Sequence, residues 1–126
     1  EDIQLYNMDV ADFIKKVACK QQKNRLFIFF DPPYEGIGNK IYRLAMEAEE
    51  YKEMIDLSCK ELHDYQWIAT YGASELIERL YCCYNCYPKK YKLQYMATLK
   101  RQELELLFHS PATKVDSFSK LQFMEE

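Results

Sequence analysis

The stretch Leu26-Phe27-Ile28-Phe29-Phe30-Asp31-Pro32-Pro33-Tyr34 decides the fold, because an unbroken apolar run ends there in an acid, two prolines and an aromatic residue. An apolar run without polar alternation is typical of a strand covered on both faces, as in a parallel sheet. The proline pair then ends the strand and restricts the backbone around it. We therefore predict a rigid polar turn at the carboxyl end of a parallel strand, where open α/β sheets bind ligands.

The groups on this turn can hold a planar amino group. Asp31 offers carboxylate oxygens, Pro32 offers only its carbonyl oxygen, and Tyr34 offers an aromatic face. Two acceptors can take both hydrogens of an exocyclic NH₂ group while its ring stacks on the tyrosine. The nitrogen lone pair is then free to attack an electrophile. For Asp31 alone, an acid that caps the next segment is the alternative interpretation.

The four residues Asp-Pro-Pro-Tyr resemble the catalytic motif of the Dam-like DNA adenine methyltransferases. Weaker matches to that family follow in order, at Leu5-Tyr6-Asn7-Met8-Asp9, Tyr42, Trp67-Ile68-Ala69-Thr70-Tyr71 and Arg101-Gln102-Glu103-Leu104-Glu105-Leu106-Leu107. The resemblance covers the chain up to about Pro111. It implies that a methyl group passes from S-adenosylmethionine to the amino nitrogen of an adenine flipped out of double-stranded DNA.

The resemblance also implies roles for the residues of the turn. Asp31 and the Pro32 carbonyl would hold the amino hydrogens, Pro33 would complete the catalytic turn, and Tyr34 would stack on the base. Asp31 and Asp9 are expected to contact the cofactor, because Asp9 resembles the family's acid near the cofactor adenine. A helix cap is the alternative role for Asp9.

Outside the turn, Tyr42 and Tyr71 either line the base pocket or belong to the core. Lys100 and Arg101 fall at a predicted hairpin turn, where they could meet DNA phosphates. A solvated charged turn is the alternative for this pair.

The composition limits the class of protein. The 126 residues predict one domain, and 17 basic against 20 acidic residues give a net charge of −3. This charge does not indicate a self-sufficient nucleic-acid binder, since phosphate contacts supply much of such affinity. No apolar run approaches the roughly 18 residues of a membrane span and no signal peptide opens the sequence, which predicts a cytoplasmic protein without membrane contact.

Five cysteines allow a zinc interpretation, and reduced thiols in an intracellular core are the alternative. The cysteine cluster and the candidate further ligands are Cys82, Cys83, Cys86, Cys59, His63 and His109. The spacing is not that of two clean Cys-x-x-Cys pairs, and we therefore expect no metal.

Apolar periodicity predicts the order of elements. The expected strands and helices alternate and end in a hairpin: strand 3–6, helix 10–20, strand 26–30, helix 47–62, strand 66–71, helix 74–82 with Ser74 as its cap, and strands 91–99 and 103–109 around a turn at 100–102. This order predicts a three-layer α/β sheet, parallel with an antiparallel edge hairpin. The resemblance implies the carboxyl-terminal half of a Rossmann-like class I methyltransferase domain over residues 1–111, followed by a loosely ordered tail at 112–126.

Three features of the family's pattern are not found. The family has a Phe-x-Gly-x-Gly-like cofactor loop and a target-recognition segment, and neither occurs in this sequence. Relatives often carry an acid or asparagine after the tyrosine that matches Tyr71, where this chain has Gly72. We therefore expect a truncated or split enzyme that is inactive alone and has the missing amino-terminal half as its partner.

The open strand edge that this half would leave also allows a homodimer. The sequence leaves open whether a restriction nuclease is a companion, as in restriction-modification systems. Three other functions stay open: an RNA adenine methyltransferase, a protein glutamine methyltransferase, and a degenerate remnant that acts as a binding module.

Overall fold

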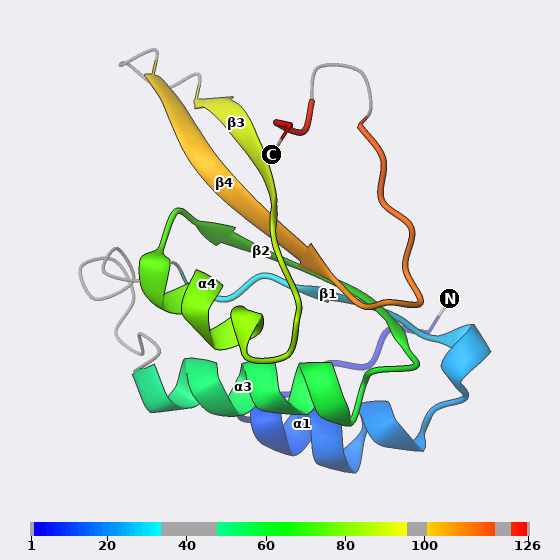
Figure 1. Cartoon of the computed structure of the whole chain (residues 1–126). Coiled ribbons are helices and arrows are strands. Elements are labelled where there is room, and N and C mark those ends of the chain that lie inside the picture. The colour runs from blue at the N-terminus through cyan, green and yellow to red at the C-terminus, as the bar shows by residue number, and fades with distance from the viewer. Residues whose placement is uncertain (1, 34–47, 96–100, 118–121, 126) are drawn as a thin grey trace.

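The computed structural model describes residues 2–33, 48–95, 101–117 and 122–125, with the backbone alone for residues 94, 95, 101 and 102. These residues form an α/β fold (Figure 1). The helices are α1 (Val10–Lys16), α3 (Ala48–Lys60) and α4 (Glu75–Cys82), with two short 3₁₀ turns at Ala18–Lys20 and Lys23–Arg25. The strands are β1 (Phe27–Phe30), β2 (Gln66–Gly72), β3 (Lys89–Tyr95) and β4 (Arg101–His109).

The four strands form one mixed sheet in the order β1-β2-β4-β3. Strand β1 runs parallel to β2, with Phe30 opposite Ala69. Strand β4 runs antiparallel to β2, with Phe108 opposite Ala69, and β3 pairs with β4 as a hairpin. The predicted parallel pair and antiparallel edge hairpin are therefore confirmed. Strand β1 forms the other edge, where the described residues place no second neighbour beside it.

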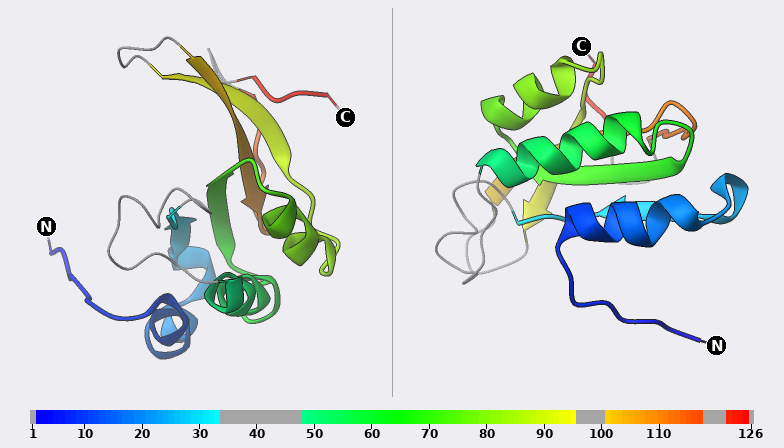
Figure 2. Two further views of the ribbon diagram at one scale, coloured as in Figure 1. Left: turned by 90° about the vertical axis from the view of Figure 1, so that its left-hand side faces the viewer. Right: turned by 90° about the horizontal axis from the view of Figure 1, so that it is seen from below.

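The core lies between the helices and one face of this sheet (Figure 2). Side chains that alternate along β2 and β4 point toward the helices and are buried: Trp67, Ala69, Tyr71, Leu106 and Phe108. All three helices contribute to the same cluster through Ile14, Tyr51, Met54, Ile55, Ile77 and Tyr81. Because the described helices share one face, the described residues form two layers.

The prediction of three layers, and of a first strand buried on both faces, is therefore wrong for the described residues. Phe27 and Phe29 of β1 point to the opposite face and are 54% and 57% exposed. Phe30, on the helix side, is buried. An apolar run can thus have one covered and one open face when nothing packs on its second side, and the sequence alone does not distinguish the two cases.

Several element boundaries differ from those predicted. Residues 3–6 form no strand, and Ile3 and Leu5 are 84% and 92% exposed. The first helix ends at Lys16, and a 3₁₀ turn replaces its last residues. Arg101 and Gln102 belong to β4, not to a turn, since Tyr95 pairs with Arg101. The predicted cap of the third helix is confirmed, because the Ile77 N–H donates to Ser74 Oγ at 3.2 Å.

The described residues beyond position 111 form little regular structure, yet two of them contact the sheet. The Met124 N–H donates to the Lys90 carbonyl at 2.7 Å, and Phe123 forms a bridge with Tyr91 at the edge of β3. The rings of Phe123 and Tyr91 meet edge to face. Among the described helices, none combines the length and apolar character that crossing a bilayer requires.

Candidate active site

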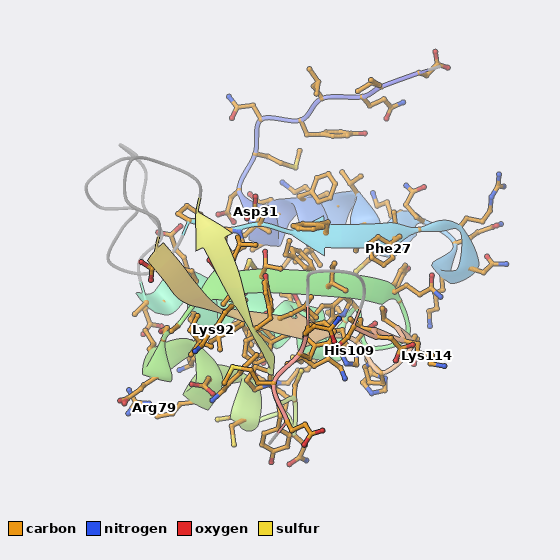
Figure 3. The ribbon with its side chains drawn as sticks, turned by 90° about the horizontal axis from the view of Figure 1, so that it is seen from above. Phe27, Asp31, Arg79, Lys92, His109 and Lys114 are labelled. Atoms are coloured by element: carbon orange, nitrogen blue, oxygen red, sulfur yellow. The ribbon has the colours of Figure 1, made fainter. Side chains whose placement is uncertain are left out.

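The predicted turn lies at the carboxyl end of β1, directly after Phe30 (Figure 3). Asp31 is exposed, Pro32 is buried and Pro33 is half-buried. Figure 3 shows Asp31 at the opposite end of the strand from Phe27. Because β1 and β2 are parallel, this is the edge of the sheet at which α/β folds bind ligands.

A pocket of about 530 Å³ opens beside the turn. Its walls come from the amino-terminal segment, the first turns of α1, strand β1 with the following turn, and α3. The described lining residues are Gln4, Leu5, Tyr6, Met8, Val10, Phe13, Ile28, Phe29, Phe30, Asp31, Pro32, Pro33 and Met54. Asp31 is the one charged side chain among them. An apolar pocket of this size, with one carboxylate among its described lining residues, is suited to a planar, uncharged or cationic ligand.

A buried tyrosine fixes the backbone of the turn. The Tyr51 hydroxyl, on α3, donates a hydrogen bond to the Pro33 carbonyl. The Tyr51 side chain is 2% exposed, and its ring contacts the ring of Tyr71. Helix α3 therefore holds the Asp-Pro-Pro turn in place through a residue that the sequence interpretation did not single out. The sequence signal for Tyr51 was its position on the apolar side of the predicted helix 47–62.

Asp9 forms the helix cap that was the alternative prediction. Its Oδ2 accepts a hydrogen bond from the Ala11 N–H at 3.1 Å, at the start of α1. Met8 and Val10 line the pocket, whereas Asp9 does not. A contact between Asp9 and a cofactor stays a prediction, and such a contact would compete with the cap for the carboxylate.

Tyr71 belongs to the core. Its side chain is 1% exposed, and its hydroxyl lies 2.8 Å from that of Tyr81. Burial raises the pKa of both hydroxyls above the ordinary tyrosine value. The core interpretation of Tyr71 is therefore the one that the geometry supports.

The other predicted site residues cannot be placed. Tyr34, Tyr42 and Lys100 lie outside the described residues, and the backbone alone is described for Arg101. Two lysines of β3 have partners within the chain: Lys90 forms an ion pair with Glu78 at 3.2 Å, and Lys89 lies over the Phe123 ring.

Glu105 of β4 and Tyr91 of β3 are buried on the face of the sheet opposite the helices. Glu105 on β4 is 1% exposed and pairs with Gly72 of β2 and Tyr91 of β3. Burial raises the pKa of Tyr91, and the negative charges of Glu105 and Asp31 raise it further. The charges of both carboxylates therefore disfavour ionisation of the same tyrosine, Tyr91. The sequence interpretation did not single out Glu105, because the register between β3 and β4 is needed to place it opposite Tyr91.

The expectation of no metal stays a prediction, since only part of the chain is described. No group of three or more histidine, cysteine, aspartate or glutamate side chains in that part of the chain is arranged to hold a metal ion. Cys82 and Cys83 are exposed on α4 and at its end.

No protein-family model matches this sequence, and a search of curated proteins found no match either. The functional interpretation therefore depends on the residues and their geometry.

Proposed function

We propose that this chain is the carboxyl-terminal part of a Dam-like DNA adenine methyltransferase with a Rossmann-like class I fold. Its substrate would be an adenine flipped out of double-stranded DNA, and its methyl donor would be S-adenosylmethionine. The observation that carries this proposal is the Asp31-Pro32-Pro33 turn, which lies at the carboxyl end of a parallel strand beside a large apolar pocket. The order of the parallel pair and the antiparallel hairpin supports it.

The pocket suits part of the cofactor. Apolar and aromatic walls fit a planar adenine ring, and a carboxylate with nearby aromatic faces fits a sulfonium cation. Asp31, Phe29 and Met8 are the residues that would hold these groups. The methionine end of the cofactor also carries a carboxylate, and no cationic side chain is among the described lining residues. We propose that the missing amino-terminal half supplies that part of the site.

When bound, S-adenosylmethionine supplies an electrophilic methyl group. The residues of this chain would position the nucleophile: Asp31 and the Pro32 carbonyl accept the two amino hydrogens, and Tyr51 keeps the turn from shifting. The rate would then come from the alignment of nitrogen and methyl carbon more than from a strong base. The Asp31 carboxylate would raise the electron density on the nitrogen as it takes the methyl group, and the amino proton would then pass to this exposed carboxylate.

The open side of β1 supports the proposed partner. The strand is an edge in the described sheet, and Phe27 and Phe29 are more than half exposed on one face. An edge strand with exposed aromatic side chains readily pairs with another strand. The missing half would add a strand to β1 and cover this face. A second copy of the chain is the competing occupant.

The test is methyl transfer by the chain combined with the polypeptide encoded directly upstream. We expect labelled methyl groups from S-adenosylmethionine to enter adenine in double-stranded DNA with both polypeptides present and with neither alone. Asp31→Asn should lower the rate roughly 10²–10³-fold, as for loss of a preorganised electrostatic contact. Asp12→Asn, which removes an exposed acid of α1, is the matched control and should leave the rate unchanged.

Three outcomes would contradict the proposal. Transfer to RNA adenine or to a glutamine amide in place of DNA would change the substrate class. Transfer by the 126-residue chain alone would refute the need for a second half. A complex that forms but transfers no methyl group would favour a degenerate binding module.

A further inference from the structure

The end of α4 places a cysteine by a defined backbone motif. The Cys86 N–H donates to the Tyr81 carbonyl at 3.2 Å, and the Asn85 N–H donates to the Cys82 carbonyl at 3.0 Å. Asn85 has φ = 56°, a left-handed conformation that asparagine tolerates better than most residues. These are the two hydrogen bonds and the left-handed residue of a Schellman motif. The backbone at Cys86 is therefore fixed relative to α4.

The same turn is attached to α3. The Tyr84 hydroxyl donates a hydrogen bond to Asp56, and Lys60 lies 3.0 Å from Asp56 and 5.8 Å from the centre of the Tyr84 ring. Asp56 and Lys60 flank Cys59 along α3. The contacts that attach Tyr84 to this helix therefore bring Cys59 and Cys86 to the same place.

The two thiols meet at a pocket that lies away from the candidate active site. Cys59 and Cys86 both line a cavity of about 210 Å³ together with His63 and His109, and the two thiols shift each other's pKa. Both cysteines are free and half-buried. His109 is opposite Ile68 near the amino end of β2, whereas Asp31 follows the carboxyl end of β1 (Figure 3). Chemistry at this pocket is therefore separate from the proposed methyl transfer.

We propose that Cys59 and Cys86 are a dithiol site that reacts with small-molecule disulfides and closes to an intramolecular disulfide. The link would join α3 to the turn after α4. The site does not depend on the proposed methyltransferase function, and the isolated chain is sufficient to test it.

The reaction is a thiol–disulfide exchange in two steps. In the first step the Cys86 sulfur, as the thiolate, attacks a small-molecule disulfide. The disulfide bond breaks, one small thiol leaves with the proton, and a mixed disulfide remains on Cys86. In the second step Cys59 loses its proton and attacks the Cys86 sulfur, and the second small thiol leaves. Two protein thiols are oxidised, and one small-molecule disulfide is reduced to two thiols.

The environments of the two sulfurs support this order. The hydrogen bond from Cys59 lowers the pKa of Cys86 against the effect of burial. The hydrogen bond to Cys86, followed by burial and nearby negative charge, raises the pKa of Cys59. Cys86 is thus the attacking thiol. Once the Cys86 sulfur is part of the mixed disulfide it carries no negative charge. It therefore no longer raises the pKa of Cys59.

The test is peptide mapping by mass spectrometry without reduction, after incubation of the chain with oxidised glutathione. We expect one linked peptide pair that contains Cys59 and Cys86 and lacks two hydrogen atoms. Cys59→Ser should trap the glutathione adduct on Cys86, and Cys86→Ser should leave Cys59 largely unmodified. The Cys82→Ser/Cys83→Ser double variant removes the exposed pair and should still form the link.

The stability of the oxidised chain gives an independent measurement. A link that closes a loop of about 27 residues should raise Tm by roughly 10 °C, through the lost entropy of the unfolded chain. A stable glutathione adduct on wild-type Cys86, a link that involves Cys82 or Cys83, or a linked form with a lower Tm would each overturn the proposal.

Discussion

The hydrogen bond from Tyr51 to the Pro33 carbonyl gives the sharpest prediction for the candidate site. Tyr51→Phe keeps the ring, which is 2% exposed and packed against Tyr71, and removes only the hydroxyl. A hydrogen bond of this kind contributes about 0.5–1.5 kcal/mol to stability, and an unpaired buried partner costs somewhat more. Since Pro33 is half-buried, water can reach part of its carbonyl in the variant. We therefore expect a loss of about 1 kcal/mol, or about 4 °C in Tm for a chain of this length.

Tyr65→Phe is the matched control. The Tyr65 side chain is 4% exposed, and its hydroxyl donates to the backbone carbonyls of Cys19 and Gln21 at 3.1 and 2.9 Å, remote from the turn. Urea denaturation should show losses of similar size for both variants. Methyl transfer in the combined enzyme should fall for Tyr51→Phe alone, and mainly in kcat, because the turn is displaced.

Two results would refute this reasoning. An unchanged free energy of unfolding for Tyr51→Phe would show that the hydrogen bond does not stabilise the turn. Equal losses of kcat in Tyr51→Phe and Tyr65→Phe would show that the effect on activity is a general consequence of lower stability.

Three further predictions follow from other parts of the structure. Asp9→Ala should lose about 1 kcal/mol of stability in urea denaturation, and Asp9→Ser should restore most of it, because serine also caps a helix; a fully stable Asp9→Ala would contradict the capping role. Phe27→Ser and Phe29→Ser should each change the free energy of unfolding by less than about 0.5 kcal/mol, because both side chains are exposed. The double variant should bind the upstream half more weakly in a calorimetric titration. An unchanged affinity would exclude this face as the interface. Burial raises the pKa of Tyr71 and Tyr81 in the folded state, so the free energy of unfolding should be full below pH about 10 and fall above it. Tyr81→Phe should make the fall of the urea midpoint with rising pH shallower. An equal fall in the variant and the wild type would contradict this prediction.

The predicted sheet illustrates what periodicity can determine. The runs at 26–30 and 66–71 and the hairpin strands appear within a few residues of their expected positions, because short apolar runs bounded by turn residues have few alternatives. The hairpin turn was misplaced, since the pairing of Tyr95 with Arg101 depends on the register with β4 and not on local composition. Residues 3–6 have the composition of a strand but no neighbour to pair with among the described residues.

The candidate site was predictable only in its local part. Asp31, Pro32 and Pro33 were found because they are adjacent in sequence and follow a strand. Tyr51 contacts the Pro33 carbonyl from α3, and such a long-range contact depends on helix packing that the sequence does not show. The Cys59–Cys86 pair depends on a Schellman motif whose left-handed residue is an asparagine, a weaker sequence signal than glycine.

The most direct test of the central claim is calorimetric titration with S-adenosylmethionine. The chain should bind the cofactor only when the upstream half is present as a second polypeptide, because the described pocket provides one carboxylate and apolar walls but no cation for the methionine carboxylate. Asp31→Ala should then weaken the binding of the complex. Binding of comparable strength by the chain alone would show that the cofactor site is complete within these 126 residues, and would contradict the proposal of a divided enzyme.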